Sequence, residues 1–206
     1  MVPTAVRLAR DVHVLAPDLP GFGRSSKPAH ALSIAALAEV LAGWMSQVGI
    51  DRAVLVGNSL GCQVIAQLGL RYSDRIGQAV LQAPTVDRYA RSAIRQFGRL
   101  ALDLPRERVP EYLINAHDYW RTGLRRGWET FQIALRDRIE DKLARLEMPV
   151  LVVRGQYDPI VSQRWVAELT AALPRGRLVT TRGAHTPNFS EPDAFASVVR
   201  AFVSPR

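Results

Sequence analysis

The chain has little cysteine, no long apolar run and no recognisable metal-binding spacing. Cys62 is the only cysteine among 206 residues, so no disulfide can form within the chain. Spacings such as Cys-x-x-Cys or His-Glu-x-x-His do not occur, so we expect neither a metal nor another cofactor. No apolar run reaches the length of a membrane-spanning helix, and Arg7, Arg10 and Asp11 interrupt any signal-like stretch. These absences predict a cytoplasmic protein without a membrane span.

The composition is that of an ordinary globular domain with a basic surface. Hydrophobic residues make up 48% and charged residues 22%, and 206 residues suffice to bury a sizeable core. The net charge of +8 could attract nucleic acid or anionic substrates. The arginines are scattered, however, and no nucleic-acid-binding motif accompanies them. We therefore expect a solvated basic surface and no nucleic-acid partner; the oligomeric state stays open.

The most informative segment begins at Gly57 and reads Gly-Asn-Ser-Leu-Gly. This is the G-x-S-x-G pattern, in which a serine, here Ser59, sits on a strained turn between a strand and a helix. A β-rich apolar run over 52–57 precedes it, and apolar residues at helical spacing follow over 62–70. This context favours a nucleophile elbow over a chance match.

Each position of this pattern carries its own expectation. Gly57 and Gly61 should be glycines because side chains there would collide in so tight a turn, whereas Asn58 and Leu60 are free to vary. The alternative is that Ser59 simply N-caps an ordinary helix after a strand.

A nucleophilic serine needs a base to take its proton and an acid to orient that base. The apolar run over 148–154 leads into a turn that carries Asp158, and a second strand-like run over 178–181 is followed by His185. The carboxyl ends of parallel strands lie at one edge of a sheet, where open α/β sheets place their sites. We therefore expect Asp158 and His185 to meet Ser59 there.

Both partners have a plainer interpretation. The aspartate before Pro159 could serve turn chemistry alone, and the histidine could be a loop residue without a role. The competing histidines are His13 in a predicted strand, His30 beside a loop proline and His117 in a helical stretch with no matching acid. His13 and Asp18 also have the spacing of an acyltransferase motif, which we interpret as coincidence because they flank the strand run.

The remaining patterns predict alternating helices and strands. Ser33 can N-cap a helix that ends at Gly49, and Asp193 can complete a capping box for a last helix that begins near Ser190. A further helix is expected over 161–173, and further strands over 12–16 and 77–82.

Together these segments resemble an α/β-hydrolase-fold serine hydrolase along nearly the whole chain. The run 16–25 resembles the family's loop after its fourth strand, 57–61 its elbow, 155–159 its acid turn and 183–185 its histidine loop. The resemblance implies a mostly parallel sheet flanked by helices, with a helical cap as an insertion.

The family's roles, carried onto this chain, make Ser59 the nucleophile, His185 the general base and then acid, and Asp158 the orienting carboxylate. The backbone N–H of Leu60 would be one oxyanion donor. The Gly-Asn-Ser form also resembles carbon–carbon bond hydrolases, but those typically carry tryptophan where this chain has Thr186. Haloalkane dehalogenases and epoxide hydrolases use an aspartate nucleophile, so the serine argues against both.

The front of the chain departs from the family pattern. Residues 1–10 already resemble the helix after the third strand, and 12–16 corresponds to the fourth strand. The third strand would lie between this strand and the elbow strand, and its loop would supply the second oxyanion N–H. We weigh a misplaced start on a longer protein, which we favour, a degenerate remnant, and direct pairing of the fourth and fifth strands.

The stretch 84–147 has no strand signals and contains many aromatic and arginine residues. In the family this position carries the cap, so we expect a cap over 84–147 between two core segments, residues 1–83 and residues 148–206. Pro105 and Pro110 are expected to break the cap into separate helices. The cap aromatics could line an acyl pocket, although packing between helices accounts for most of them; they are Tyr89, Phe97, Tyr112, Tyr119, Trp120, Trp128 and Phe131.

The leading hypothesis is a serine hydrolase that acts on a small-molecule carboxylic ester or related acyl compound. One alternative is a non-catalytic ligand-binding or remnant protein that lacks the oxyanion loop. Another is a carbon–carbon bond hydrolase or an acyltransferase that uses the same three residues.

Overall fold

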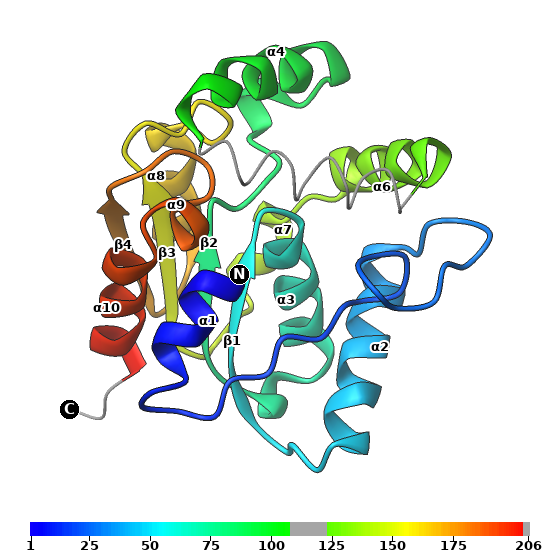
Figure 1. Cartoon of the computed structure of the whole chain (residues 1–206), viewed down its shortest axis with the longest axis vertical. Coiled ribbons are helices and arrows are strands. Elements are labelled where there is room, and N and C mark those ends of the chain that lie inside the picture. Colours follow the sequence, from blue (N-terminus) through cyan, green and yellow to red (C-terminus); the bar gives the residue numbers. More distant parts are fainter. Residues whose placement is uncertain (108–122, 204–206) are drawn as a thin grey trace.

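The structure, a computed structural model, describes residues 1–107 and 123–203. Its described residues form one sheet of four parallel strands in the order β1-β2-β3-β4 (Figure 1). The strands are β1 (Ala53–Asn58), β2 (Ile76–Gln82), β3 (Val150–Gly155) and β4 (Gly176–Thr181). Because all four are parallel, their carboxyl ends meet at one edge, as the resemblance predicts.

Strand side chains alternate between two buried clusters, one on each face of the sheet. Ala79 and Leu81 of β2 belong to the larger cluster, whereas Val80 between them belongs to the smaller. The larger cluster is covered by α2 (Ile34–Gln47), α3 (Leu60–Arg71) and α8 (Gln163–Ala172). The smaller is covered by α1 (Val2–Leu8) and α10 (Pro192–Val203), which pack on each other. The described residues thus form the three layers of an α/β fold.

Helix starts follow local capping chemistry, with one difference from prediction. Ser33 caps α2 as expected, since its Oγ accepts a hydrogen bond from the Ala36 N–H at 3.1 Å. The last helix, α10, begins at Pro192, close to the predicted start near Ser190, but the expected capping box is wrong. Ser190 ends a short helix, α9 (Pro187–Ser190), and its Oγ donates to the Thr186 carbonyl at 3.2 Å instead of capping α10. Asp193, the expected capping-box partner, pairs with Arg7 of α1 at 2.7 Å.

The predicted strand over 12–16 is wrong, and the structure does not bear out the weighed explanation in which it pairs directly with the elbow strand. These residues form no ladder with any strand in the described part of the chain. Val14 packs against the smaller cluster, while Leu15 stays exposed. Consequently β1 is an edge strand of the described sheet, and Val54 in it is 41% exposed.

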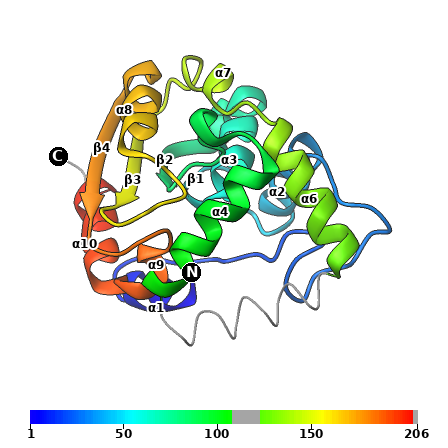
Figure 2. The same cartoon turned by 90° about the horizontal axis from the view of Figure 1, so that it is seen from above.

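Of the described helices between β2 and β3, α4 (Ala93–Asp103) lies above the carboxyl ends of the strands and α6 (Leu124–Arg136) lies on the side of α2 (Figures 1 and 2). The short helix α7 (Glu140–Leu143) packs between α3 and α8 in the helix layer. Two 3₁₀ turns, η2 (Arg88–Ala90) and η3 (Leu104–Arg106), flank α4. Among the described residues of 84–147 there is no strand, and α4 ends two residues before Pro105, as predicted. Pro110, Tyr112, His117, Tyr119 and Trp120 lie outside the described residues.

Aromatic side chains join α4 to α6. The Phe97 ring centroid lies 5.0 Å from that of Phe131 and 6.3 Å from that of Trp128, with the Phe97 and Trp128 rings stacked. These three aromatic residues therefore pack between helices α4 and α6, the alternative to lining an acyl pocket. The domain boundaries at 83 and 147 stay a prediction.

Candidate active site

Ser59 sits on a strained turn between β1 and α3. Its backbone adopts φ 52° and ψ −114°, a positive φ that non-glycine residues rarely take. The Ser59 N–H donates to the Gln82 carbonyl at 3.0 Å, which ties the turn to the end of β2. This is the local geometry that the G-x-S-x-G pattern predicts.

The two glycines of the pattern do not play equal parts. A Cβ on Gly57 would lie 2.7 Å from the Gly61 carbonyl carbon and 2.7 Å from the Ile65 side chain, so only glycine fits there. A Cβ on Gly61 would meet nothing within 4 Å. The expectation of a collision at Gly61 is therefore wrong, because that residue points its Cβ position away from the turn.

The Ser59 hydroxyl is not used as a helix cap. Within the described residues it makes no capping bond to α3, and its Oγ lies 3.2 Å from Thr85 Oγ1. Thr85 is buried just beyond the end of β2, at the same edge of the sheet. Sequence reasoning missed Thr85, because it belongs to no motif and lies three residues past the end of β2.

Asp158 and His185 come from the ends of neighbouring strands β3 and β4 and lie in contact. His185 Nδ1 lies 3.0 Å from Asp158 Oδ2. The other oxygen, Asp158 Oδ1, accepts from the Ile160 N–H at 2.7 Å and the Val161 N–H at 2.9 Å. Both carboxylate oxygens are thus engaged, and Asp158 and His185 are only 3% and 8% exposed. The carboxylate is held in one orientation toward the imidazole.

Close backbone packing brings the histidine loop onto the acid turn. A Cβ on Gly155 would lie 1.9 Å from the Ala184 carbonyl oxygen, so only glycine allows this approach. Gly183 turns the chain with φ +100°, a left-handed conformation that favours glycine. These two glycines explain how His185 can reach back to Asp158.

The elbow also reaches the histidine loop. The His185 carbonyl accepts hydrogen bonds from Gln82 Nε2 at 3.1 Å and Asn58 Nδ2 at 3.4 Å. The three predicted segments therefore meet at the carboxyl edge. Within the described residues, however, Ser59 Oγ bonds to Thr85 and makes no hydrogen bond to His185. Asn58, expected to be free to vary, takes part in holding the site.

Carboxylates around His185 raise the pKa of its imidazole. Burial lowers that pKa, but the charge of Asp158 and its hydrogen bond, together with the charges of Asp103 and Glu107, outweigh the effect. Negative charges therefore surround the imidazole. Sequence reasoning missed Asp103 and Glu107, because only the folding of α4 over the sheet edge brings them here.

Two further groups complete the neighbourhood of the serine. Leu60 is the first residue of α3, so its backbone N–H has no acceptor within the helix and lies at the positive end of the helix dipole. Cys62 is fully buried, its Sγ contacts the Gly57 and Gln82 carbonyls, and burial raises the pKa of the thiol. Cys62 is therefore packed rather than reactive.

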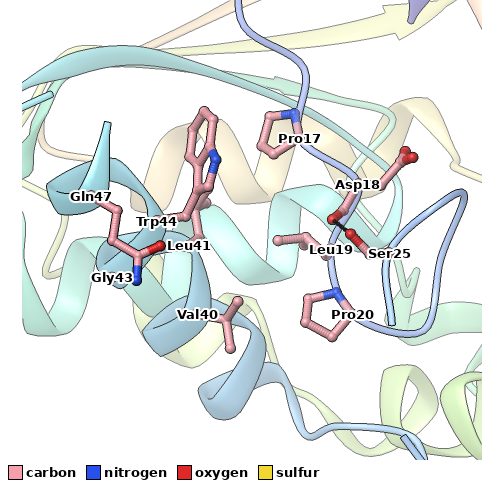
Figure 3. A pocket seen from close by; sticks show the side chains of 10 residues that line it. All are labelled: Pro17, Asp18, Leu19, Pro20, Ser25, Val40, Leu41, Gly43, Trp44 and Gln47. Atoms are coloured by element: carbon pink, nitrogen blue, oxygen red, sulfur yellow. Dashed lines mark hydrogen bonds between the residues drawn. The ribbon is translucent and has the colours of Figure 1, made fainter. Parts of the chain in front are cut away.

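A separate groove of about 480 Å³ lies beside α2 (Figure 3). It runs between α2 and the loop that contains Asp18 and Ser25. Two hydrogen bonds hold this loop: Asp18 Oδ2 accepts from the Arg24 N–H at 2.8 Å, and Ser25 Oγ donates to the Asp18 carbonyl at 2.5 Å. None of the three predicted catalytic residues lines it. Its lining is Pro17, Asp18, Leu19, Pro20, Ser25, Val40, Leu41, Gly43, Trp44 and Gln47.

The other predicted alternatives lie away from this edge. His13 is exposed, and Asp18 serves its own loop. His30 is exposed and lies 3.3 Å from Glu129 of α6. Over residues 1–107 and 123–203, no cluster of three or more histidine, cysteine or acidic side chains could hold a metal ion. In the same residues, no helix is long and apolar enough to cross a membrane.

The sequence and the fold are both similar to known hydrolases. The family model for the alpha/beta hydrolase family matches residues 2–198. An uncharacterized protein of Mycobacterium tuberculosis is 28% identical over 240 residues, covering 96% of this chain and 69% of that protein. A pimeloyl acyl-carrier-protein methyl ester esterase of Vibrio campbellii is 23% identical over 235 residues, covering 94% and 84%. A solved hydrolase of Pseudomonas aeruginosa is similar with a TM-score of 0.77 and 28% identity, covering 96% of this chain and 82% of that one.

Proposed function

Because the chain belongs to the alpha/beta hydrolase family, we propose that it is a serine hydrolase that cleaves a carboxylic ester or a related acyl compound without a cofactor. The observation that carries the proposal is the buried contact of His185 Nδ1 with Asp158 Oδ2, at the sheet edge where Ser59 occupies its strained turn. A buried, oriented imidazole at the same edge as a serine on a strained turn is the arrangement that activates a hydroxyl for attack. The similarity to an esterase supports the same class of substrate.

Each residue has a stated part in the reaction. Ser59 Oγ would exchange its contact with Thr85 for His185 Nε2, lose its proton to that nitrogen and attack the acyl carbon. Asp158 would stabilise the imidazolium that forms, and the Leu60 N–H would donate to the developing oxyanion. His185 would then protonate the leaving alcohol. Water, deprotonated in turn by His185, would release the acid from the acyl-enzyme and restore Ser59.

A fluorophosphonate tests this proposal without knowledge of the substrate. The reagent phosphonylates an activated serine, so intact-mass analysis should show about one label per chain, lost in Ser59→Ala. Ser197→Ala is the matched control, because Ser197 is exposed on α10 and its Oγ bonds only to the Asp193 carbonyl at 2.9 Å. A folded chain that stays unlabelled, or equal labelling of Ser59→Ala, would contradict the proposal and favour a non-catalytic protein.

A further inference from the structure

Two carboxylates from the cap side lie near His185, and one of them, Glu107, bonds to the residue after it. Asp103 is the last residue of α4, and Glu107 follows the turn η3. Glu107 Oε1 accepts a hydrogen bond from the Thr186 N–H at 2.7 Å. The pKa of Asp103 is raised to about 6, mainly by burial and also by the charges of Glu107 and Asp158. The charge and the backbone N–H of His185 act in the opposite direction and lower it. Both groups therefore act on the segment that carries the predicted base.

The position of Asp103 is unfavourable on local grounds. A carboxylate at the carboxyl end of a helix meets the negative end of the helix dipole. Asp103 is only 7% exposed, its side chain does not cap η3, and its Oδ1 has no hydrogen-bond partner among the described residues. Burying a charge in such a place is costly unless an opposite charge lies near. His185 is the group nearby that can supply that charge.

The histidine loop is held from two sides. From the sheet, Gln82 and Asn58 donate to the His185 carbonyl. From the cap, Glu107 accepts from the next backbone N–H, that of Thr186. Within residues 1–107 and 123–203, the ionisable groups whose charge acts on the imidazole are Asp158 from the turn after β3 and the cap residues Asp103 and Glu107. Two of these three carboxylates thus come from the segment between β2 and β3.

We propose that Asp103 and Glu107 are positioning residues for His185: Glu107 holds the histidine loop from the cap side through the Thr186 N–H, and both carboxylates place negative charge near the imidazole. The inference rests on the proposed function, in which His185 is the base. The pKa of His185 then depends on where α4 lies relative to the sheet edge. A cap helix that moved away would take both charges with it and leave Asp158 alone with the imidazole.

The titration of His185 tests this directly and needs no catalysis. NMR of histidine-labelled protein follows four imidazoles, and His185→Gln identifies the relevant signal. We expect Asp103→Asn and Glu107→Gln each to lower the His185 midpoint by about half a pH unit or more, because each removes a facing negative charge. Asp141→Asn is the matched control, since Asp141 of α7 is exposed and pairs with Arg138; it should leave the midpoint unchanged.

Charge and hydrogen bonding can be separated at Glu107. Glutamine keeps a carbonyl oxygen for the Thr186 N–H and loses only the charge, whereas alanine loses both. Glu107→Gln should move the acid limb of the fluorophosphonate labelling profile downward with little change in the maximum rate. Glu107→Ala should move the limb and also lower the maximum rate at high pH, because the loop loses a contact. Equal profiles for the wild type and both variants would contradict the inference.

The two readouts distinguish this inference from the proposed function. A lowered His185 midpoint in chains that are never labelled would support the cap-side charges and overturn the hydrolase proposal. Full labelling with an unchanged midpoint in Asp103→Asn and Glu107→Gln would support the hydrolase and overturn the inference.

Discussion

The carboxyl edge of the sheet and the groove beside α2 differ in what their residues do. The groove has a volume of about 480 Å³, but its polar residues Asp18 and Ser25 make hydrogen bonds only within their own loop among the described residues. The sheet edge has instead a concentration of buried polar side chains, a serine with positive φ and carboxylates against an imidazole. Perturbed, buried ionisable groups mark functional sites more reliably than volume alone. Buried polar groups, rather than volume, therefore make the sheet edge the candidate site.

The same contrast appears in how each region is held. The acid turn is braced by Arg154, whose Nε donates to the Val161 carbonyl and whose Nη2 donates to the Asp158 carbonyl, both at 2.7 Å. Helix α4 is tied to this turn by Arg99, which bonds to buried Asp87 at 2.6 Å and to the Ile160 carbonyl at 2.7 Å. The groove, by contrast, is lined by half-buried and exposed side chains such as Val40. The following predictions, in order of expected effect, test this difference.

The largest effect is expected from Asp158→Asn. The amide oxygen can still accept from the Ile160 and Val161 N–H groups, but its NH₂ would face His185 Nδ1 and favour the wrong tautomer. We expect the rate of fluorophosphonate labelling to fall by about 10⁴-fold with the fold retained, as judged by circular dichroism. Asp193→Asn, an exposed carboxylate on α10, is the control and should label at the wild-type rate. Near-normal labelling of Asp158→Asn would remove Asp158 from the proposed mechanism.

A smaller effect, on stability, is expected from Arg99→Met. The Asp87 side chain is fully buried, and burial raises its pKa, but hydrogen bonds from Arg99, Ser162 and Tyr89 lower it below its usual value. Removing Arg99 leaves a buried charge without its counter-ion, which should cost about 3–5 kcal/mol in urea unfolding. Arg125→Met, which breaks an exposed pair on α6, should change little. Equal losses of unfolding free energy in the two variants would show that the bonds of Arg99 to Asp87 and Ile160 stabilise the fold no more than an exposed ion pair.

The pH dependence of labelling should be shifted in a stated direction. His185 acts as a base only when neutral, and its raised pKa keeps it protonated to a higher pH than an ordinary histidine. The labelling rate of the wild type should therefore fall as pH drops through a midpoint above 6.5, about tenfold per unit below it. An acid limb with its midpoint below 6.5 would contradict the net effect of the surrounding carboxylates.

The smallest effect is expected in the groove. Trp44 of α2 lines it and is half-buried, so Trp44→Ala should cost about 1 kcal/mol of stability, less than truncation of a fully buried aromatic residue. Its labelling rate should stay within about twofold of the wild type, because no residue of the sheet-edge site lines the groove. A tenfold fall in labelling would show that the two regions are coupled after all.

Local sequence patterns predict most helices and strands and the candidate site residues. They fail where the structure of a segment depends on residues that are distant in the chain. The run over 12–16 has the composition of a strand, yet it forms none because a strand needs a partner for its backbone groups. The expectations for Ser190 and Gly61 rest on motifs that many turns share. Thr85 belongs to no motif, and only the end of β2 places it beside the serine.

Periodicity and tight-turn glycines act over a few residues, so they suffice to predict the alternation of strands and helices, the strained serine turn and the order of serine, aspartate and histidine. The fold alone shows that Gly155 lets the histidine loop touch the acid turn, that Ser59 lies against Thr85, and that the charges of Asp103 and Glu107 act on His185. The hydrogen bond from the Thr186 N–H to Glu107 joins residues 79 positions apart in the chain. Burial and charge at such distances arise only when α4 packs over the edge of the sheet, so no local pattern could encode them.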